Sequence, residues 1–258
     1  MNKFAMITGA SAGIGEATAL KLAKLGYDLL LTARRTDLLE AVAVKCRAAG
    51  SKKVIVKALD VSDLNAVEKL FALTELKADL ENLTALVNNA GLAKGMAPMD
   101  QAAISDWQLM VDTNVMGLLY VTRFALPMLK KNKGHVVNLG SVAGHWTYAG
   151  GAIYCATKAA VKALTEGLRM DVHGSGVRVT NIEPGMVETD FSLVRLGDKT
   201  AAEKVYANFH ALSPEDVADC IEWSMSRPAH VNIQEMIVFP TDQGAIQMTH
   251  RPGASPAK

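Results

Sequence analysis

Residues 3–26 read KFAMITGASAGIGEATALKLAKLG, and the expected architecture of the whole chain follows from them. The apolar run at 3–8 stops at a glycine, and residues 16–25 show helical periodicity before Gly26 ends them. The order is therefore strand, glycine-rich turn and helix. Unpaired amides at a helix N-terminus bind phosphate, and glycine lets the backbone come close, so residues 8–15 predict a dinucleotide-binding turn. A turn that contains glycine only for its backbone geometry is the alternative.

The same alternation continues along the chain. Further apolar strands are expected at 28–33, 53–58, 84–88, 135–139, 177–182 and 235–239. Helices are expected at 36–49, 63–78, 101–131, 152–173 and 214–226, with an irregular stretch before residue 212. Strands that are apolar on both faces and alternate with helices predict one parallel sheet covered on both sides, in a single α/β domain. The last residues, QMTHRPGASPAK, are expected to be a loose tail.

The composition argues against several classes of protein. Of the 258 residues 50% are hydrophobic, and the formal net charge is only +1. This charge predicts neither a nucleic-acid footprint nor attraction to an anionic membrane. We find no signal-peptide pattern and no run of about twenty apolar residues that could span a bilayer. The cysteines are few and lack metal-type spacing, which favours a reducing, cytoplasmic compartment and predicts no metal site.

The end of the second strand bears on the choice of dinucleotide. NAD sites usually carry an acidic residue there for the ribose 2′-hydroxyl, whereas this chain has Arg34 and Arg35. Two guanidinium groups suit a 2′-phosphate, so NADP is favoured over NAD. Asp37 is the competing feature, although it lies at a helix start, where a carboxylate interacts favourably with the helix dipole.

Residues 141–158 read SVAGHWTYAGGAIYCATK and bring a hydroxyl, a phenol and an ammonium group close together. Tyr154 and Lys158 are one helical turn apart, so they share a helix face. A neighbouring cation favours the phenolate and lowers the tyrosine pKa from its free value of about 10. The pair therefore predicts a proton donor and acceptor, with an ordinary solvated helix face as the alternative.

Together these motifs resemble the short-chain dehydrogenase/reductase family over nearly the full chain. The resemblance rests on the ordered set of residues 8–15, Asp60-Val61, Asn88-Asn89-Ala90-Gly91, Asn114, Ser141, Tyr154 with Lys158, and Pro184-Gly185 followed by Thr189. It implies a single Rossmann-fold domain, residues 1–245, with a doubly wound sheet of seven parallel strands. It also implies a substrate lid over about residues 186–212, a tail at 246–258 and a homotetramer.

The resemblance implies a role for each matched residue. Tyr154 is expected to be the general acid in reduction and the base in oxidation, and Ser141 to hold the substrate oxygen. Lys158 is expected to lower the tyrosine pKa and to bind the nicotinamide ribose, and Asn114 to position a water for proton relay. Further expected cofactor contacts are Gly9, Ser11, Gly13, Ile14, Gly15, Arg34, Arg35, Asp60, Val61, Asn88, Ala90, Gly91, Pro184, Gly185, Val187 and Thr189.

Four stretches are similar to one group within the family, the NADP-dependent 3-hydroxy acid dehydrogenases: NNAGLAKGMAPM, WTYAGGAIYCATKA, RVTNIEPGMVETDFS and PAHVNI. This resemblance implies reversible oxidation of the 3-hydroxyl of small acids such as serine and L-allo-threonine. The rival interpretations are a broad NADPH-dependent reductase of carbonyls, aldehydes and dicarbonyls, and a nucleotide-binding regulator without catalysis. A 3-hydroxy acid needs a cation or several amides near its carboxylate. Arg195 is the first candidate and His145 the second, and a solvated surface charge is the alternative for Arg195.

Two of the expected helices indicate self-association. Between residues 115 and 129 the apolar side chains leave little polar face, and the segment 152–168 is rich in alanine and glycine. Small side chains permit another helix to approach closely, so a homo-oligomer is favoured. Packing of both helices inside a monomer is the alternative.

Overall fold

One parallel sheet organises the chain in the computed structural model, which describes residues 3–252. Its seven strands have the order β3-β2-β1-β4-β5-β6-β7, and every neighbouring pair is parallel. The strands are β1 (Phe4–Thr8), β2 (Asp28–Ala33), β3 (Val54–Ala58), β4 (Leu83–Asn88), β5 (His135–Leu139), β6 (Arg178–Pro184) and β7 (Glu235–Val238). The strand order reverses direction beside β1, which confirms the predicted doubly wound α/β fold.

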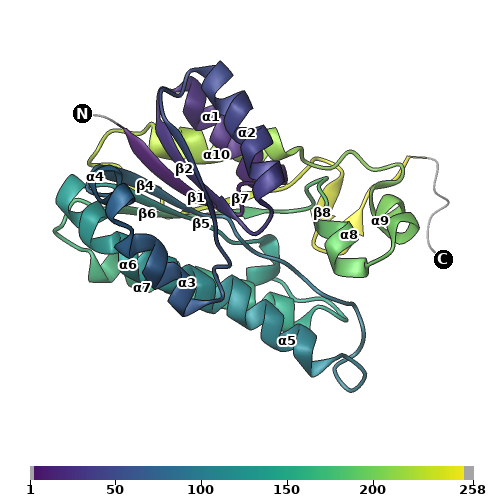
Figure 1. Cartoon of the computed structure of the whole chain (residues 1–258). Coiled ribbons are helices and arrows are strands. Elements are labelled where there is room, and N and C mark those ends of the chain that lie inside the picture. The colour runs from purple at the N-terminus through teal and green to yellow at the C-terminus, as the bar shows by residue number, and fades with distance from the viewer. Residues whose placement is uncertain (1–2, 253–258) are drawn as a thin grey trace.

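Helices cover both faces of the sheet (Figure 1). One face carries α1 (Gly13–Lys24), α2 (Thr36–Ala49) and α10 (Pro214–Met225), which contact one another through α1. The other carries α3 (Leu64–Ala72), α4 (Lys77–Leu80), α5 (Ile104–Val111), α6 (Gly117–Asn132) and α7 (Ala152–Asp171). The helix predicted at 63–78 is broken, because Leu73 adopts an extended backbone and a 3₁₀ turn, Thr74–Leu76, follows it.

The apolar core has two halves, one on each side of the sheet. Alternate residues of β1 supply them: Ile7 points into the cluster beneath α1, α2 and α10, and Met6 into the cluster beneath α3 and α6. Both side chains are fully buried. A strand that is buried on both faces has to be apolar throughout, which is why the periodicity of two expected of a half-exposed strand is missing here.

The segment Ile104–Asn132 is helical throughout, with a π-helical stretch, Asp112–Met116, joining α5 to α6. By length and mean hydropathy (1.2) it could cross a membrane, which the sequence analysis did not anticipate. In the fold it packs against β4 and α3, and 44% of its most apolar window is buried. It is therefore a core helix.

Two further helices lie beyond the carboxyl ends of the strands (Figure 1). The stretch that we expected to be irregular contains α8 (Phe191–Leu196), which Gly197 ends with a φ of 66°, and α9 (Lys199–Tyr206). The predicted tail is also partly ordered. Its Met248–Thr249 forms strand β9 of a hairpin with β8 (Gln243–Ala245), and Arg251 donates hydrogen bonds to the carbonyl groups of Val205 and Ala207. Residues 253–258 of that tail lie outside the described residues.

Candidate active site

A cleft of about 420 Å³ opens at the carboxyl ends of the strands, where ligands of doubly wound sheets bind. Most of the residues predicted to contact a cofactor line it, and so do the predicted catalytic side chains of the 141–158 stretch. The predicted residues in its lining are Gly9, Ser11, Gly13, Ile14, Arg34, Arg35, Asp60, Val61, Ala90, Gly91, Ser141, Tyr154, Lys158, Pro184, Gly185, Val187 and Thr189.

The glycine-rich turn fits a bound phosphate. Helix α1 begins at Gly13 in the cleft wall, and its N-cap, Ala12, has no side chain that could accept from the first amides. These amides and the positive end of the helix dipole are therefore available to an anion. Gly13 has a φ of 56°, and a methyl group on Gly15 would come within 2.4 Å of the Gly9 carbonyl oxygen. Larger residues at these two positions would displace the loop.

Two arginines line the same cleft where β2 ends. The side chains of Arg34 and Arg35 are exposed, and Arg35 Nη2 lies 3.5 Å from Ser11 Oγ in the glycine-rich turn. The cation pair thus lies beside the proposed phosphate loop. Asp37, the competing acidic residue, is in the first turn of α2 and does not line the cleft. The donor set therefore fits a nucleotide with an additional phosphate on its ribose.

Ser141, Tyr154 and Lys158 meet on one wall of the cleft, and all three are at least nine-tenths buried. Ser141 caps a 3₁₀ turn, η3 (Val142–Gly144), directly after β5, whereas Tyr154 and Lys158 lie on the first turns of α7. The ammonium group of Lys158 donates to the carbonyl oxygen of Leu139 at 2.7 Å and lies 5.9 Å from the centre of the Tyr154 ring. Residues from β5 and α7 thus converge as the sequence predicts.

Burial shifts the pKa values of Tyr154 and Lys158. Burial raises the pKa of Tyr154 well above its ordinary value, and the Ser141 hydroxyl and the Arg195 charge act in the opposite direction. The expected lowering of the Tyr154 pKa by Lys158 stays a prediction. Burial lowers the pKa of Lys158 itself to about 8, against the attraction of Glu183. Both groups are therefore driven toward their neutral forms.

Asn114 lies behind this wall rather than in the cleft. It is in the π-helical stretch, and its side chain accepts from the Leu92 amide and donates to the Leu92 carbonyl, both at 2.8 Å, and to Thr157 Oγ1 at 3.1 Å. A methyl group on Gly91 would meet Asn114 Oδ1 at 3.2 Å and Lys158 Nζ at 3.6 Å. Asn114 thus fixes the loop after β4 beside the lysine.

A second cleft, of about 270 Å³, lies on the other side of Tyr154. Arg195 of α8 reaches into it: the guanidinium lies 5.2 Å from the centre of the Tyr148 ring and 5.8 Å from that of Tyr154. Arg195 Nε donates to the Gly95 carbonyl at 3.3 Å, and the Gly95 amide donates to the Arg195 carbonyl at 2.9 Å. Among the ion pairs of residues 3–252, none involves Arg195, so its charge is not neutralised by a carboxylate of this part of the chain.

Two of the predicted cofactor contacts lie elsewhere. Gly15 packs under the glycine-rich turn, and the Asn88 side chain points into the core, where it donates to Thr122 and Asn138. The neighbouring Asn89 lines the cleft instead and donates to the carbonyl groups of Thr8 and Gly9. The lining also contains Asp190, Phe191 and Val194 of the expected lid, and Thr113, which the sequence did not point to.

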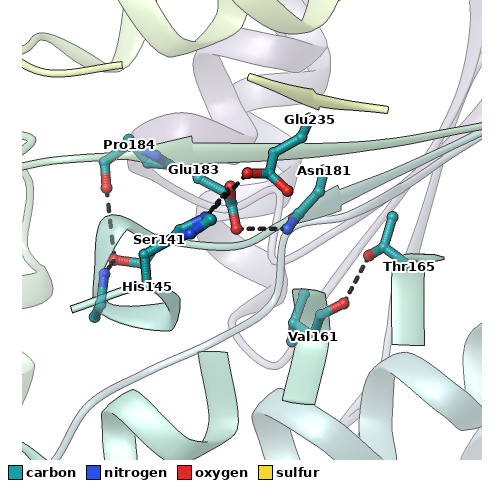
Figure 2. Close-up of polar contacts among 9 residues, drawn as sticks. Ser141, His145, Val161, Thr165, Asn181, Glu183, Pro184 and Glu235 are labelled. Carbon is teal, nitrogen blue, oxygen red and sulfur yellow. Dashed lines mark hydrogen bonds and ion pairs between the residues drawn. The ribbon is translucent and has the colours of Figure 1, made fainter. Parts of the chain in front are cut away.

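His145, the second candidate for a substrate carboxylate, lines neither cleft. Its Nε2 lies 2.7 Å from Glu183 Oε2 and 3.1 Å from Glu235 Oε1 (Figure 2). An imidazole already held by two carboxylates is not available to a third, so this alternative is wrong. The nitrogen and oxygen atoms of the three residues contact one another directly, and we assign no metal to them.

Comparisons with known proteins agree with this geometry. Residues 3–196 match the family described as short chain dehydrogenase. The chain is 46% identical over 239 residues to serine 3-dehydrogenase of Agrobacterium fabrum, covering 92% of this chain and 94% of that protein. It is 44% identical over 241 residues to the NADP-dependent 3-hydroxy acid dehydrogenase YdfG of Escherichia coli K12, covering 92% and 95%.

A solved structure described as the closed form of serine dehydrogenase complexed with NADP⁺ is similar over nearly the whole fold. It superposes with a TM-score of 0.88 at 42% sequence identity and covers 96% of this chain and 99% of that one. The family match spans the glycine-rich turn, β1 to β6 and the residues Ser141, Tyr154 and Lys158. The chain belongs to the short-chain dehydrogenase/reductase family.

Proposed function

We propose that this protein is an NADP-dependent oxidoreductase that reversibly oxidises the 3-hydroxyl group of small 3-hydroxy acids such as serine and L-allo-threonine. Relatives with this activity in their names share 44 to 46% of their residues with it over 92% of the chain. One observation carries the proposal. Tyr154 lines both clefts, with Ser141 and Lys158 on the cofactor side and Arg195 on the other side.

The larger cleft holds the cofactor in this proposal. The amides at the start of α1 bind the pyrophosphate, and Arg34 and Arg35 bind the 2′-phosphate. When bound, NADP supplies the hydride acceptor in oxidation and the hydride donor in reduction. Lys158 contacts the ribose on the nicotinamide side, and its donation to the Leu139 carbonyl keeps the long side chain in place.

The proton that accompanies the hydride is handled by Tyr154. Ser141 holds the substrate oxygen, and the phenol donates a proton to that oxygen in reduction and accepts it in oxidation. Burial keeps the phenol protonated, which suits the acid role directly. For oxidation the phenolate must form, and the Ser141 hydroxyl and the Arg195 charge both favour it.

Arg195 selects the carboxylate of the substrate. It belongs to the region 186–212 that we propose as the lid, and the Gly95–Arg195 contacts join this lid to the loop after β4. Among residues 3–252 no carboxylate pairs with this guanidinium, which lies 5.8 Å from the centre of the Tyr154 ring. It is therefore suited to bind a carboxylate two carbons away from the carbon that bears the reacting hydroxyl.

The Tyr154→Phe variant tests the proposal. Loss of the phenolic proton donor removes a factor of roughly 10² to 10⁴ from turnover, whereas NADPH binding, measured by fluorescence titration, is expected to change less than about threefold. Tyr120→Phe, on α6 and outside both clefts, is the matched control and is expected to keep full activity. Turnover by Tyr154→Phe at the wild-type rate would contradict the proposed acid.

We also propose that the enzyme is a cytoplasmic homo-oligomer, with four subunits as in the implied tetramer. An exposed stripe of Ala152, Ala156, Ala159 and Ala163 runs along α7 toward Met170, which is 57% exposed. Such a stripe lets a second helix approach closely. Light scattering after size-exclusion chromatography is expected to give a multimer for the wild type and a smaller species for Ala163→Arg. A wild-type monomer would contradict this assignment.

A further inference from the structure

A cluster of three titratable side chains lies next to the wall of the cleft that carries Ser141, and it takes no part in the proposed chemistry. Figure 2 shows His145, Glu183 on β6 and Glu235 on β7 facing one another, with Nε2 of the histidine 2.7 Å and 3.1 Å from the two carboxylates. Glu183 is completely buried, and the side chains of His145 and Glu235 are 14% and 27% exposed. Because burying a carboxylate costs free energy, its retention at this place calls for an explanation.

Glu183 lies directly behind Ser141. The next residue, Pro184, has the carbonyl group to which Ser141 Oγ donates at 3.5 Å (Figure 2). The stem of Glu183 packs against Gly140, where a methyl group would come within 2.8 Å of Glu183 Cγ. Glu183 Oε1 accepts from Asn181 Nδ2 at 2.7 Å, which leaves Oε2 for the histidine. The carboxylate is thus fixed against the backbone that carries the serine.

His145 closes the turn that Ser141 begins. Ser141 Oγ accepts from the Ala143 amide at 3.1 Å, and the His145 amide donates to the Val142 carbonyl at 3.0 Å. On its other side the turn rests on α7, since a methyl group on Gly144 would meet the Lys158 carbonyl at 2.8 Å. The turn therefore lies between α7 on one side and, through the His145 side chain, β6 and β7 on the other.

We infer that His145 is a positioning residue: its imidazole fastens the serine-bearing turn to Glu183 and Glu235 and so sets the place of the Ser141 hydroxyl relative to the Tyr154 phenol. The inference rests on the proposed role of Ser141 in the reaction. His145 touches neither cleft, so it acts only through the turn.

The contact of the His145 imidazole with the two carboxylates is also expected to depend on pH. Glu183 and Glu235 face the imidazole from β6 and β7, and Lys158 on α7 interacts with Glu183 from the other side. Burial and the Glu235 charge raise the pKa of Glu183, and His145 opposes that rise. With a pKa raised to about 7, Glu183 changes its charge near neutral pH, and the strength of its contact with the imidazole changes with it.

A double-mutant cycle tests the inference, with kcat for NADP-linked serine oxidation as the readout. His145→Asn is expected to lower kcat by about 10- to 100-fold, since small displacements of a reacting group have effects of this size. The dissociation constant for NADPH is expected to stay within about twofold. In the Ser141→Ala background, His145→Asn is expected to cause no further loss, because the two residues act on the same step. His173→Asn, an exposed histidine after α7, is the matched control.

The pH profile gives a readout that a purely structural role would not move. The ratio of wild-type to His145→Asn kcat is expected to change across about pH 7, where the buried Glu183 gains or loses its proton. If His145→Asn does not fold, Glu235→Gln weakens the same contact, and a smaller loss that also vanishes in the Ser141→Ala background is expected.

Unchanged kcat in His145→Asn, a loss that adds to that of Ser141→Ala, or a ratio that does not vary with pH would each overturn the inference. Full turnover by Ser141→Ala alone would instead contradict the proposed function, so the two failures are distinguishable.

Discussion

Replacing Arg195 with methionine separates recognition of the substrate carboxylate from every other role of this residue. Methionine keeps part of the aliphatic stem, and the backbone bond from the Gly95 amide to the residue 195 carbonyl is retained. What is lost is the positive charge near the Tyr148 and Tyr154 rings and the bond from Nε to the Gly95 carbonyl. These two losses affect all substrates alike, whereas the loss of a carboxylate contact affects only acids.

The size of the effect follows from the surroundings of the guanidinium. A hydrogen bond to a charged group is worth about 1.5 to 3 kcal/mol, and the half-buried position of Arg195 favours the lower part of that range. At about 1.4 kcal/mol per factor of ten, kcat/KM for an acid substrate is expected to fall by roughly 10- to 30-fold more than that for an uncharged one.

The matched substrates are 3-hydroxypropionate and its methyl ester, which differ only at the acid end. The rate of NADPH formation is measured for both with the wild type and with Arg195→Met, and Arg123→Met, an exposed arginine on α6, is the control variant. The acid-to-ester ratio of kcat/KM is expected to fall with Arg195→Met and to stay constant with the control. A ratio within about twofold of wild type would refute the carboxylate role, even if both activities decreased.

Two further predictions concern the cofactor and the buried lysine. Replacing Arg34 and Arg35 together by alanine removes two charge-assisted contacts of about 1.5 kcal/mol each. In a fluorescence titration the dissociation constant for NADP is therefore expected to rise about 100-fold, and that for NAD less than about threefold. Equal effects on the two dissociation constants would contradict the assignment of the 2′-phosphate. Lys158 has a pKa of about 8 in the folded protein, below its ordinary value. From about pH 8 to about pH 10 the unfolded chain therefore holds a proton that the folded protein lacks. The free energy of unfolding rises with pH in that window. In urea unfolding the wild type is therefore expected to gain up to about 3 kcal/mol relative to Lys158→Met over this window, and parallel stability curves would contradict it.

The sheet and its nucleotide turn could be predicted because their signals are local. The central residues of β1 and β2 are apolar on both faces because both faces are covered, and the turn between β1 and α1 needs small residues to approach a phosphate. Helices α8 and α9 were missed for the opposite reason. They have 6 and 8 residues, too few to be stable alone, and depend on contacts with distant segments such as those of Tyr206 with Ser192 and Val187.

The proposed catalytic residues could be placed together from their spacing and from the family resemblance, but the effect of burial on their pKa values could not be predicted. Tyr154 and Lys158 share the α7 face as expected, yet burial, which no local pattern reports, moves their pKa values toward the neutral forms. Asn88 and Asn89 show a similar limit, since only the three-dimensional position of the strand end decides which asparagine faces the cleft. The partners of His145 lie 38 and 90 residues away, so no sequence motif joins the cluster.

The central claim is that this enzyme transfers hydride between NADP and the C3 hydroxyl of a small 3-hydroxy acid. A single panel of kcat/KM values tests it directly: NADP-linked oxidation of serine, L-allo-threonine, 3-hydroxybutyrate and 3-hydroxypropionate, measured beside reduction of simple aldehydes and dicarbonyls by NADPH. We predict that the 3-hydroxy acids are oxidised with NADP and that the activity with serine or L-allo-threonine disappears with Tyr154→Phe. A preference for uncharged carbonyls by orders of magnitude, with no measurable oxidation of any 3-hydroxy acid, would contradict the claim.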